Sequence, residues 1–510
     1  MRNRPLHALF GVLATLLGVA VGHLVASLLI PSSSPVLAVG STVIDHTPHQ
    51  LKDWAIRSFG NSDKAILVDS VLGGVLVLAA IAGLLALRRF AYGAALLVIL
   101  VAVAAGAAVT RPTAGFQDLV PSIATGIAGV AALWWLTRAA GSRPEPDPAS
   151  EPGATTVGPT RRGVLVAVGA LGVAATVMGG AGRSISKYRT RPEDVTLPAA
   201  ADPAPPFPVG LDDKVPGISP FRSSNEDFYR VDTRLDVPIV SIEGWTLTID
   251  GDVERELTFT FDELAAMPLI ERDITLTCVS NSVGGKYVGG ARWLGVRLTD
   301  LLDLAGVGDQ ADQMFATDVD GMTIGTPLEL ATDGRDAMIA IGMNGEALPR
   351  AHGFPARVVI PGLYGFISAT KWVTRITLTT YEKDRSYWTQ RRWATDAPIK
   401  LSSRIDTPRA FETVKAGQVL IGGMAWAQDL GGVARVEVRI DGGAWQEARL
   451  GPDAGNDYWR QWYLPWYAQP GDHALAVRAV NGGGEVQSAV RALPFPEGSS
   501  GIQDLQVTVA

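Results

Sequence analysis

The stretch Asp273-Ile274-Thr275-Leu276-Thr277-Cys278-Val279-Ser280-Asn281 contains Cys278, the only cysteine in the 510 residues of the chain. Ile274, Leu276 and Cys278 alternate with polar residues, which predicts a strand with one buried face. A glycine-rich run from Ser282 to Gly290 follows, and glycines let a backbone approach a ligand closely or adopt positive φ. A thiol at the end of a strand, against such a loop, suits a bound cofactor.

A lone cysteine also has a simpler interpretation, because free cysteine is among the most buried residue types and packs as a small apolar side chain. Cys278 has no partner for an internal disulfide, although the topology argued below places its domain outside the cytoplasm. On residue type alone both interpretations, buried apolar residue and cofactor ligand, stay open.

A second motif lies downstream and runs Asn344-Gly345-Glu346-Ala347-Leu348-Pro349-Arg350-Ala351-His352-Gly353-Phe354-Pro355-Ala356-Arg357-Val358-Val359-Ile360-Pro361-Gly362, followed by Tyr364-Gly365 and Lys371-Trp372-Val373. Together the two stretches resemble the sulfite oxidase superfamily of molybdopterin enzymes. That family holds molybdenum with a cysteine thiolate in a Cys-x-x-Asn-like loop and carries an NGxxLPxxHGxPxRxxxPG…KW signature. The resemblance extends from Pro216 to Ala510 and does not cover the first 200 residues.

The resemblance implies a molybdenum–molybdopterin cofactor, with Cys278 as the metal ligand and a catalytic residue. The positions that correspond to cofactor contacts of the family are Asn225, Tyr229, Arg230, Cys278, Thr317 (or Asp318), His352, Arg357, Ala369, Thr370 and Lys371. Arg357 suits bidentate phosphate binding, Lys371 adds a point charge, and His352 is expected to hydrogen-bond the pterin or its phosphate. Core packing is the alternative for Tyr229. Tyr387 corresponds to the active-site tyrosine of the family if the alignment is given a gap.

The loop after Cys278 departs from sulfite oxidase. In that enzyme two arginines of the loop belong to the pocket for anionic sulfite, whereas here Ser282 and Val283 follow Asn281. The cationic residues that are candidates to replace them are Lys286, Arg292, Arg391 and Arg392. We therefore predict poor turnover of sulfite.

Composition indicates a membrane protein and gives no sign of nucleic-acid binding. The net charge is −7, the sequence pI is about 5.5, and the mean hydropathy of +0.19 is high for a soluble chain. The apolar excess lies in the first third, in five segments near the ~20 residues that a spanning helix needs. These segments are 6–30, 66–87, 91–109, 119–136 and 163–182.

Flanking lysines and arginines favour a cytoplasmic N-terminus. With that orientation the inner segments hold eight cationic residues, namely Arg2, Arg4, Arg88, Arg89, Arg138, Arg143, Arg161 and Arg162. The outer loops hold four, namely Lys52, Arg57, Lys64 and Arg111. Five spans then place everything after Gly182 outside the cytoplasm. The cations after the fifth span argue the other way, namely Arg183, Lys187, Arg189 and Arg191.

The fifth span is preceded by Arg161-Arg162 and by a Pro/Gly/Ser-rich linker, Gly141 to Pro159, and so resembles a twin-arginine export signal. An ordinary arginine pair at the start of a helix is the alternative. Heme is not expected, because His7 and His23 are the only histidines within a span and both lie in the first. The bundle is instead interpreted as an anchor, or as a docking surface for a cytochrome or quinone-linked electron partner.

Shorter patterns predict the remaining elements. Phe259 to Leu264 predicts a strand leading into a helix capped by Asp262, and Arg297 to Ala305 a short amphipathic helix. Near the C-terminus, Val433 to Ile440 alternates and turns back towards Trp445, and Tyr458 to Tyr467 is interpreted as an aromatic-rich strand pair. Short strands at this spacing suggest an immunoglobulin-like sandwich. It is similar to the family's dimerisation domain, which implies a homodimer.

The sequence thus predicts a transmembrane bundle over 1–182, a linker over 183–216, an α+β molybdopterin-binding domain over 217–405, and an all-β immunoglobulin-like sandwich over 411–510. The function expected is that of a membrane-anchored, molybdopterin-dependent oxidoreductase that transfers an oxygen atom to or from a small substrate outside the cytoplasm. Its direction, sulfite-oxidase-like or sulfoxide-reductase-like, stays open. The alternative is a non-catalytic membrane-tethered binding protein with two β-rich domains.

Overall fold

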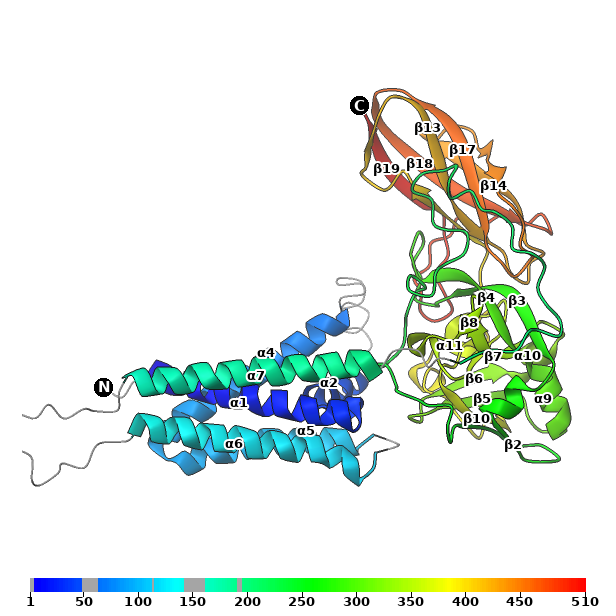
Figure 1. Ribbon diagram of the computed structural model, residues 1–510. Coiled ribbons are helices and arrows are strands. Elements are labelled where there is room, and N and C mark those ends of the chain that lie inside the picture. Colours follow the sequence, from blue (N-terminus) through cyan, green and yellow to red (C-terminus); the bar gives the residue numbers. More distant parts are fainter. Residues whose placement is uncertain (1–3, 48–62, 112–113, 142–160, 190–194) are drawn as a thin grey trace, which may run out of the picture. The chain divides into compact units, whose positions relative to one another are not determined.

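The computed structural model describes residues 4–47, 63–111, 114–141, 161–189 and 195–510. They form two compact units, one of Met1–Arg191 with Asp232–Ile239 and the other of Pro192–Val231 with Val240–Ala510 (Figure 1). Residues 142–159 of the predicted linker lie outside the described residues, as do Arg2, Lys52, Arg57 and Arg143 of the charge argument.

The first unit is helical. Its helices are α1 (Arg4–Leu28), α2 (Pro35–His46), α4 (Asp63–Arg88), α5 (Phe90–Val109), α6 (Val120–Gly141) and α7 (Arg161–Arg189). Within the described residues, five stretches are long and apolar enough to cross a membrane: Arg4–Leu28, Ile66–Arg88, Phe90–Val109, Phe116–Ala140 and Gly163–Ser186. This agrees with the five predicted segments. The short helix α2 was not predicted, and it contains His46, which the sequence placed in a loop.

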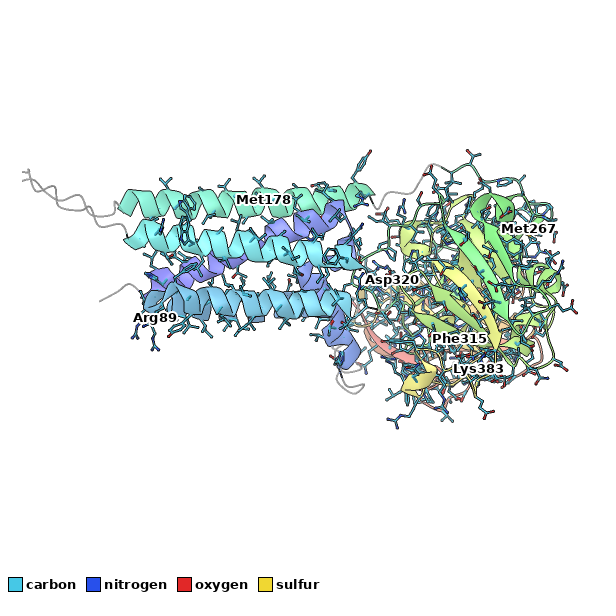
Figure 2. All side chains as sticks on the ribbon, turned by 90° about the horizontal axis from the view of Figure 1, so that it is seen from below. Arg89, Met178, Met267, Phe315, Asp320 and Lys383 are labelled. Carbon is cyan, nitrogen blue, oxygen red and sulfur yellow. The ribbon has the colours of Figure 1, made fainter. Side chains whose placement is uncertain are left out.

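Small residues let the helices of this unit approach closely. A Cβ on Gly11 of α1 would lie 1.9 Å from the Ala79 carbonyl oxygen of α4, and a Cβ on Gly83 of α4 would lie equally close to His7. Such contacts are typical of helices that pack in lipid. The outer surface stays apolar, since α7 exposes Leu165, Val173 and Val177. Side chains project from the helices along their length, with Met178 labelled on α7 in Figure 2.

The second unit contains two sheets that carry the candidate site. One has the order β3-β4-β7-β8, with β9 paired to β7, and the other β2-β1-β10-β5-β6. Their strands are β1 (Thr246–Gly251), β2 (Leu257–Thr260), β3 (Leu269–Thr277), β4 (Val288–Arg297), β5 (Gln313–Asp318), β6 (Thr323–Pro327), β7 (Met338–Met343), β8 (Glu346–Ala347), β9 (Arg357–Val359) and β10 (Val373–Thr379). Short helices connect them: α8 (Phe261–Ala265), α9 (Leu298–Ala305), α10 (Leu328–Thr332) and α11 (Gly365–Ser368).

The C-terminal part of the same unit is all-β. Its two sheets have the orders β11-β13-β17-β16 and β12-β19-β18-β14-β15. The strands are β11 (Ser402–Thr407), β12 (Thr413–Val414), β13 (Gly417–Trp426), β14 (Val433–Ile440), β15 (Gln446–Glu447), β16 (Arg449–Leu450), β17 (Arg460–Ala468), β18 (Gly471–Asn481) and β19 (Gln503–Val509). Side chains from both sheets, such as Trp462 and Val477, share one core. Its immunoglobulin-like class stays a prediction.

Several local predictions need correction. The N-cap of α8 is Thr260 and not Asp262. The Thr260 hydroxyl accepts a hydrogen bond from the Glu263 amide, and the Glu263 carboxylate accepts one from the Thr260 amide. The aromatic run is not a strand pair: residues 460–467 lie in one strand, β17, and residues 458–459 precede it. The helix α9 is as predicted, with Leu298, Leu301, Leu302 and Ala305 on its buried face.

β3 is buried on both faces, whereas alternation predicted one. The second face is covered by the C-terminal domain: the Trp459 amide donates to Thr275 Oγ1 (2.9 Å), and the Thr275 amide donates to the Asp457 carbonyl (2.9 Å). The predicted linker covers an edge of the same sheet. The Ala201 amide donates to the Leu269 carbonyl (2.9 Å), so this extended segment is bound along β3 rather than free.

Candidate cofactor site

Cys278 follows β3 and begins a loop that returns to β4. The Cys278 amide donates to the Tyr287 carbonyl (2.9 Å), and the Asn281 amide donates to the Cys278 carbonyl (2.9 Å). Asn281 Oδ1 accepts from the Tyr287 amide (2.9 Å), which closes the loop from the other side. The thiol is 9% exposed, and its Sγ lies 2.9 Å from Ser280 Oγ. The loop therefore presents one nearly enclosed thiol at the end of a strand.

Burial raises the pKa of the Cys278 thiol, while hydrogen bonding by Ser280 and the positive charge of Lys371 act against that rise. The thiol is therefore protonated at neutral pH unless a cation joins it. A bound metal ion supplies such a charge and deprotonates a coordinating thiol. The Cys278 thiol is therefore neutral without a metal and becomes a thiolate when a metal binds, which fits the role of a metal ligand.

A group of cationic and imidazole side chains lies close to the thiol. Arg357 begins β9 and forms an isolated antiparallel bridge with Lys371. Arg357 Nη1 donates to the His352 carbonyl (3.0 Å), and its guanidinium lies 5.0 Å from the centre of the Trp293 ring. Burial lowers the pKa of Arg357 to about 10. None of the carboxylates that the structure describes pairs with Arg357.

A buried guanidinium without a counter-ion is costly. An anionic group, held by charge-assisted hydrogen bonds, would offset that cost. Arg357 and Lys371 therefore form a cradle suited to a phosphate, and their role as phosphate ligands stays a prediction.

His352 is buried in the 3-10 turn Arg350–His352, and its Nε2 lies 3.0 Å from the Asn225 carbonyl oxygen. Burial and the charge of Arg357 lower the pKa of His352 to about 4, so the ring is neutral at pH 7. Because a carbonyl oxygen only accepts, Nε2 carries the proton and Nδ1 is an acceptor. Such a ring suits an N–H donor of a pterin better than a phosphate oxygen.

The segment from Asn225 to Arg230 reaches the same place. Asn225 Oδ1 accepts from the side chain of Asn344 (2.8 Å). Tyr229 is close enough to Cys278 and Arg357 to sense both, since burial and then the thiol raise its pKa while the guanidinium opposes them. The charge of Arg230 reaches His352. These three predicted residues therefore lie around the thiol and the cation cradle.

The predicted backbone contacts lie beside the cradle. The Ala369 amide ends helix α11 by donating to the Gly365 carbonyl (3.1 Å), and the Thr370 carbonyl accepts from Val358 of β9 (2.9 Å). Thr317 is in β5, where its carbonyl accepts from Thr374 Oγ1 (3.4 Å). This contact is with β10 and not with the thiol group, so the role of Thr317 stays a prediction.

Two tyrosines have different environments. Tyr387 lies in the loop after β10, where its amide donates to Thr323 Oγ1 (3.1 Å) and Arg391 lies 3.5 Å from its ring centre. Tyr364 is buried, and burial, with a contribution from Cys278, raises its pKa to about 12. Tyr364 is thus, with Tyr229, a tyrosine whose pKa the thiol affects. Tyr364 lies beside the second motif but was not among the predicted site residues.

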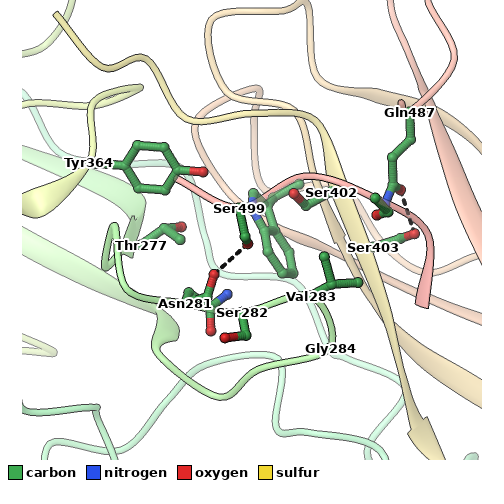
Figure 3. Close-up of a pocket in the computed structure, with 12 residues that line it drawn as sticks. Thr277, Asn281, Ser282, Val283, Gly284, Tyr364, Ser402, Ser403, Gln487 and Ser499 are labelled. Atoms are coloured by element: carbon green, nitrogen blue, oxygen red, sulfur yellow. Dashed lines mark hydrogen bonds between the residues drawn. The ribbon is translucent and has the colours of Figure 1, made fainter. Parts of the chain in front are cut away.

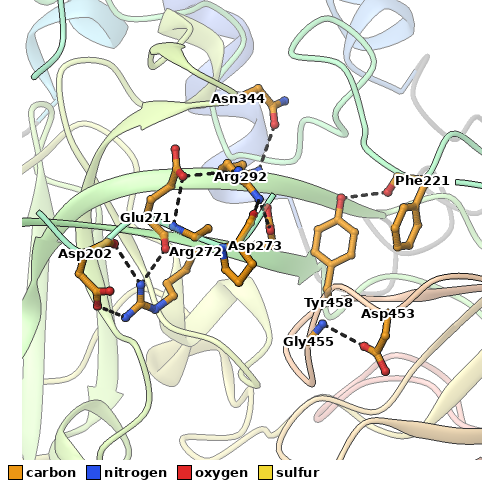
Figure 4. A network of polar contacts seen from close by, with 12 residues as sticks. Asp202, Phe221, Glu271, Arg272, Asp273, Arg292, Asn344, Asp453, Gly455 and Tyr458 are labelled. Atoms are coloured by element: carbon orange, nitrogen blue, oxygen red, sulfur yellow. Dashed lines mark hydrogen bonds and ion pairs between the residues drawn. The ribbon is translucent and has the colours of Figure 1, made fainter. Parts of the chain in front are cut away.

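The four candidates for a sulfite-binding cation differ in their surroundings. Arg292 binds Asp273 (2.7 Å) and the Pro205 carbonyl (2.6 Å) in the network drawn in Figure 4. Arg391 donates to the Tyr387 carbonyl (3.0 Å). Lys286 and Arg392 are exposed. None of these four gives a buried, unneutralised charge at the Cys278 loop.

A cation that sequence reasoning missed touches the loop. Arg404 of β11 is buried and donates to the Gly285 carbonyl (2.9 Å). Its charge is matched by Asp406 (2.6 Å). Arg404 thus anchors the glycine-rich loop without offering a free charge. Its position on a strand of the other domain explains why no local pattern identified it.

Comparisons with known proteins agree with this geometry. Residues 234–388 match the family described as oxidoreductase molybdopterin binding domain. The chain is 34% identical to human mitochondrial sulfite oxidase over 301 residues, which is 50% of this chain and 55% of that protein. It is 32% identical to the NADH nitrate reductase of Hordeum vulgare over 276 residues, covering 43% and 30%. The chain thus spans about half the length of the human relative.

A solved structure with similar architecture is that of the sulfane dehydrogenase SoxCD from Paracoccus pantotrophus. It aligns with a TM-score of 0.50 and 26% identity, over 56% of this chain and 81% of that chain. The family model covers residues 234–388, and all of these except 234–239 belong to the second unit.

Proposed function

Since this chain carries a molybdopterin-binding oxidoreductase domain of the sulfite oxidase superfamily, we propose that it is a membrane-anchored enzyme that transfers an oxygen atom to or from a small substrate. The observation that carries the proposal is the meeting of a nearly enclosed thiol, Cys278, with the buried guanidinium of Arg357, the half-buried ammonium of Lys371 and the neutral ring of His352. These residues come from three separate segments of the chain.

The residues present fit the cofactor. Cys278 Sγ would hold the metal, Arg357 and Lys371 would hold the anionic end of the pterin, and Nδ1 of His352 would accept from a pterin N–H. When bound, the cofactor supplies two-electron oxidation and reduction together with oxygen-atom transfer. The chain itself encloses the thiol, positions it through the loop hydrogen bonds, and keeps His352 uncharged.

The metal and pterin content of the purified full-length chain tests this proposal. We expect close to one molybdenum and one pterin per chain when the host makes the cofactor, and turnover with an artificial electron carrier. A chain that is folded but free of molybdenum and pterin would favour the alternative, a non-catalytic membrane-tethered binding protein. Assays of oxidation and of reduction on the same preparation decide the direction.

The membrane arrangement rests on the helical unit. Five apolar helices of spanning length precede the oxidoreductase domain, and the flanking cations favour a cytoplasmic N-terminus. We infer that the domain after Gly182 lies outside the cytoplasm and that Arg161-Arg162 directs its export after the cofactor is loaded. A reporter fused after Ala510 that is active only in the cytoplasm would contradict the inferred side. Export that is unchanged when both arginines become lysine would remove the twin-arginine interpretation.

Two partners follow from the same proposal. Electrons released by or needed for the reaction require a carrier, for which a cytochrome or a quinone-linked membrane protein is the expected class. The C-terminal domain is the candidate surface for a homodimer. Mass measurement of the detergent-solubilised chain, compared with a chain truncated after residue 405, tests the dimer. If the full-length and the truncated chain contain the same number of subunits per particle, the C-terminal domain is not the dimer surface.

A further inference from the structure

A small cavity lies between the Cys278 loop and the C-terminal β domain (Figure 3). Its volume is about 10 Å³. The polar residues around it are Thr277, Asn281, Ser282 and Tyr364 from the oxidoreductase domain, and Ser402, Ser403, Trp426, Gln487 and Ser499 from the C-terminal segment. No charged side chain of the described residues lines the cavity. It is therefore a neutral, polar site.

Two polar atoms of the lining residues have no hydrogen-bond partner among the described residues. They are Thr277 Oγ1 and Trp426 Nε1, in side chains that are 1% and 2% exposed. Other lining groups are already engaged: Ser499 Oγ donates to the Asn281 carbonyl (2.5 Å), and Ser403 Oγ donates to Gln487 Oε1 (2.6 Å). A buried donor without a partner is strongly unfavourable. The two atoms thus point to a shared missing partner.

We propose that one water molecule occupies this cavity and bridges Trp426 Nε1 and Thr277 Oγ1. An indole N–H only donates, so the occupant must accept, and a hydroxyl can donate or accept. The volume is at the lower limit for one water, which excludes an organic ligand. An anion would find no cation in the lining.

The bridge gives the C-terminal domain a role in presenting the thiol. Thr277 is the last residue of β3 and directly precedes Cys278. Successive side chains of an extended chain point to opposite faces. The water would therefore hold the strand end from behind while the thiol faces the charge of Lys371. Trp426 and Thr277 are accordingly positioning residues, which act through the strand and not on a substrate.

Thermal unfolding of the full-length chain provides the first test. Trp426→Phe and Thr277→Val each remove one polar atom and preserve most of the side-chain shape. We expect each to lower Tm by roughly 2–4 °C. The Tm of the double variant should be no lower than that of the less stable single variant, because each single substitution already removes the same water bridge.

Trp462→Phe is the matched control. Trp462 is fully buried and its Nε1 also has no partner, but it does not line the cavity. Removing an unsatisfied donor there should leave Tm unchanged or raise it. If Trp426→Phe and Thr277→Val behave like Trp462→Phe, the cavity is dry and the proposal is wrong.

Alkylation of Cys278 separates positioning from stability. The full-length chain from a host that lacks the cofactor has a single thiol, so the pH dependence of its alkylation reports this site alone. We expect Trp426→Phe and Thr277→Val to change the rate severalfold, Thr277→Ser to restore it, and Trp462→Phe to leave it unchanged. An unchanged rate in Thr277→Val would overturn the positioning role. If Trp426→Phe does not fold, the comparison of Thr277→Val with Thr277→Ser provides the test. None of these readouts depends on enzymatic activity.

Discussion

Arg357 and Lys371 form an isolated antiparallel bridge, and Gly353 packs against both so closely that a Cβ there would lie 3.0 Å from Arg357 Cβ and 3.1 Å from Lys371 Cβ. The glycine has a φ of +115°, which disfavours any side chain. The motif residue after His352 is therefore glycine for two reasons, backbone conformation and space. This arrangement brings the buried guanidinium of Arg357 and the half-buried ammonium of Lys371 onto neighbouring backbone positions, and we expect an anion to bind there.

Gly353→Ala tests this packing. The substitution should displace Arg357 and Lys371 and reduce the pterin content of the purified chain severalfold, with a loss of stability of roughly 1–3 kcal/mol from the positive φ and the close contact. The matched control is Gly345→Ala, because Gly345 also has positive φ (+86°) but has nothing within 4 Å of its Cβ position. The control should lose stability from the backbone alone and keep its pterin. Equal pterin in both variants would show that Gly353 does not shape the cradle.

The low pKa of His352 predicts a pH dependence. The folded-state pKa of about 4 lies below the ordinary histidine pKa of 6.5, so between these two pH values the unfolded chain binds more protons. Stability should therefore fall as pH falls from about 6.5 to 4, by at most about 3 kcal/mol from this group. Denaturant unfolding of the full chain and of His352→Gln, which cannot titrate, isolates the contribution as a difference. Parallel pH curves for the two proteins would show that His352 is not held neutral.

Asp457 should show the opposite sign. Burial and the negative charges of Asp429 and Asp336 raise the pKa of Asp457 to about 6, from the ordinary value of 3.8. The ionised carboxylate at pH 7 is therefore destabilising, and Asp457→Asn should raise the free energy of unfolding by roughly 1–3 kcal/mol there. The gain should disappear near pH 4, where the native carboxyl is protonated. If Asp457→Asn raises the free energy of unfolding equally at pH 4 and pH 7, the gain does not come from removing a charge and the prediction is wrong.

Sulfite should be a poor substrate. Ser282 and Val283 provide no charge, Arg292 is paired with Asp273, and Arg404 is paired with Asp406. A desolvated anion needs charge-assisted hydrogen bonds that this loop does not offer. Steady-state kinetics with sulfite and with a neutral S-oxide, on one molybdenum-loaded preparation, compare the two substrate classes. A kcat/KM for sulfite within the usual enzyme range of about 10⁴–10⁸ M⁻¹s⁻¹ would refute the prediction.

Long apolar helices and the compact motif could be predicted from sequence because their signals are local. The five predicted segments of spanning length correspond to five helices. In the second motif, His352 lies in a 3-10 turn and Arg357 in the strand that follows it, so both residues are close in sequence as well as in space. The burial of both faces of β3 could not be predicted. Thr275 and Thr277 are polar by type. Thr275 is bonded by Trp459, 184 residues later in the sequence, and Thr277 shares a cavity with Trp426, so residues of the C-terminal domain account for this burial.

The candidate site shows the same division. Cys278, Arg357 and Lys371 were identified by motif, and the structure places them together. Tyr387 was chosen by an alignment with a gap, and its catalytic role stays a prediction, while Tyr229 and Tyr364 are tyrosines whose pKa values the thiol affects. Arg404, which anchors the loop at Gly285, lies on a distant strand, and no spacing rule connects it to the loop.

The central claim is that Cys278 holds the metal while Arg357 and Lys371 independently hold the pterin. A soft thiolate suits the metal, and a serine oxygen is harder. The measurement that tests it most directly is the molybdenum and pterin content of Cys278→Ser and Arg357→Ala, with activity assayed by an artificial electron carrier. We predict that Cys278→Ser keeps its fold and most of its pterin but loses activity, and that Arg357→Ala loses the cofactor and leaves a thiol free to alkylate. Full turnover by Cys278→Ser would contradict the account, because Cys278 would then be only a small buried residue.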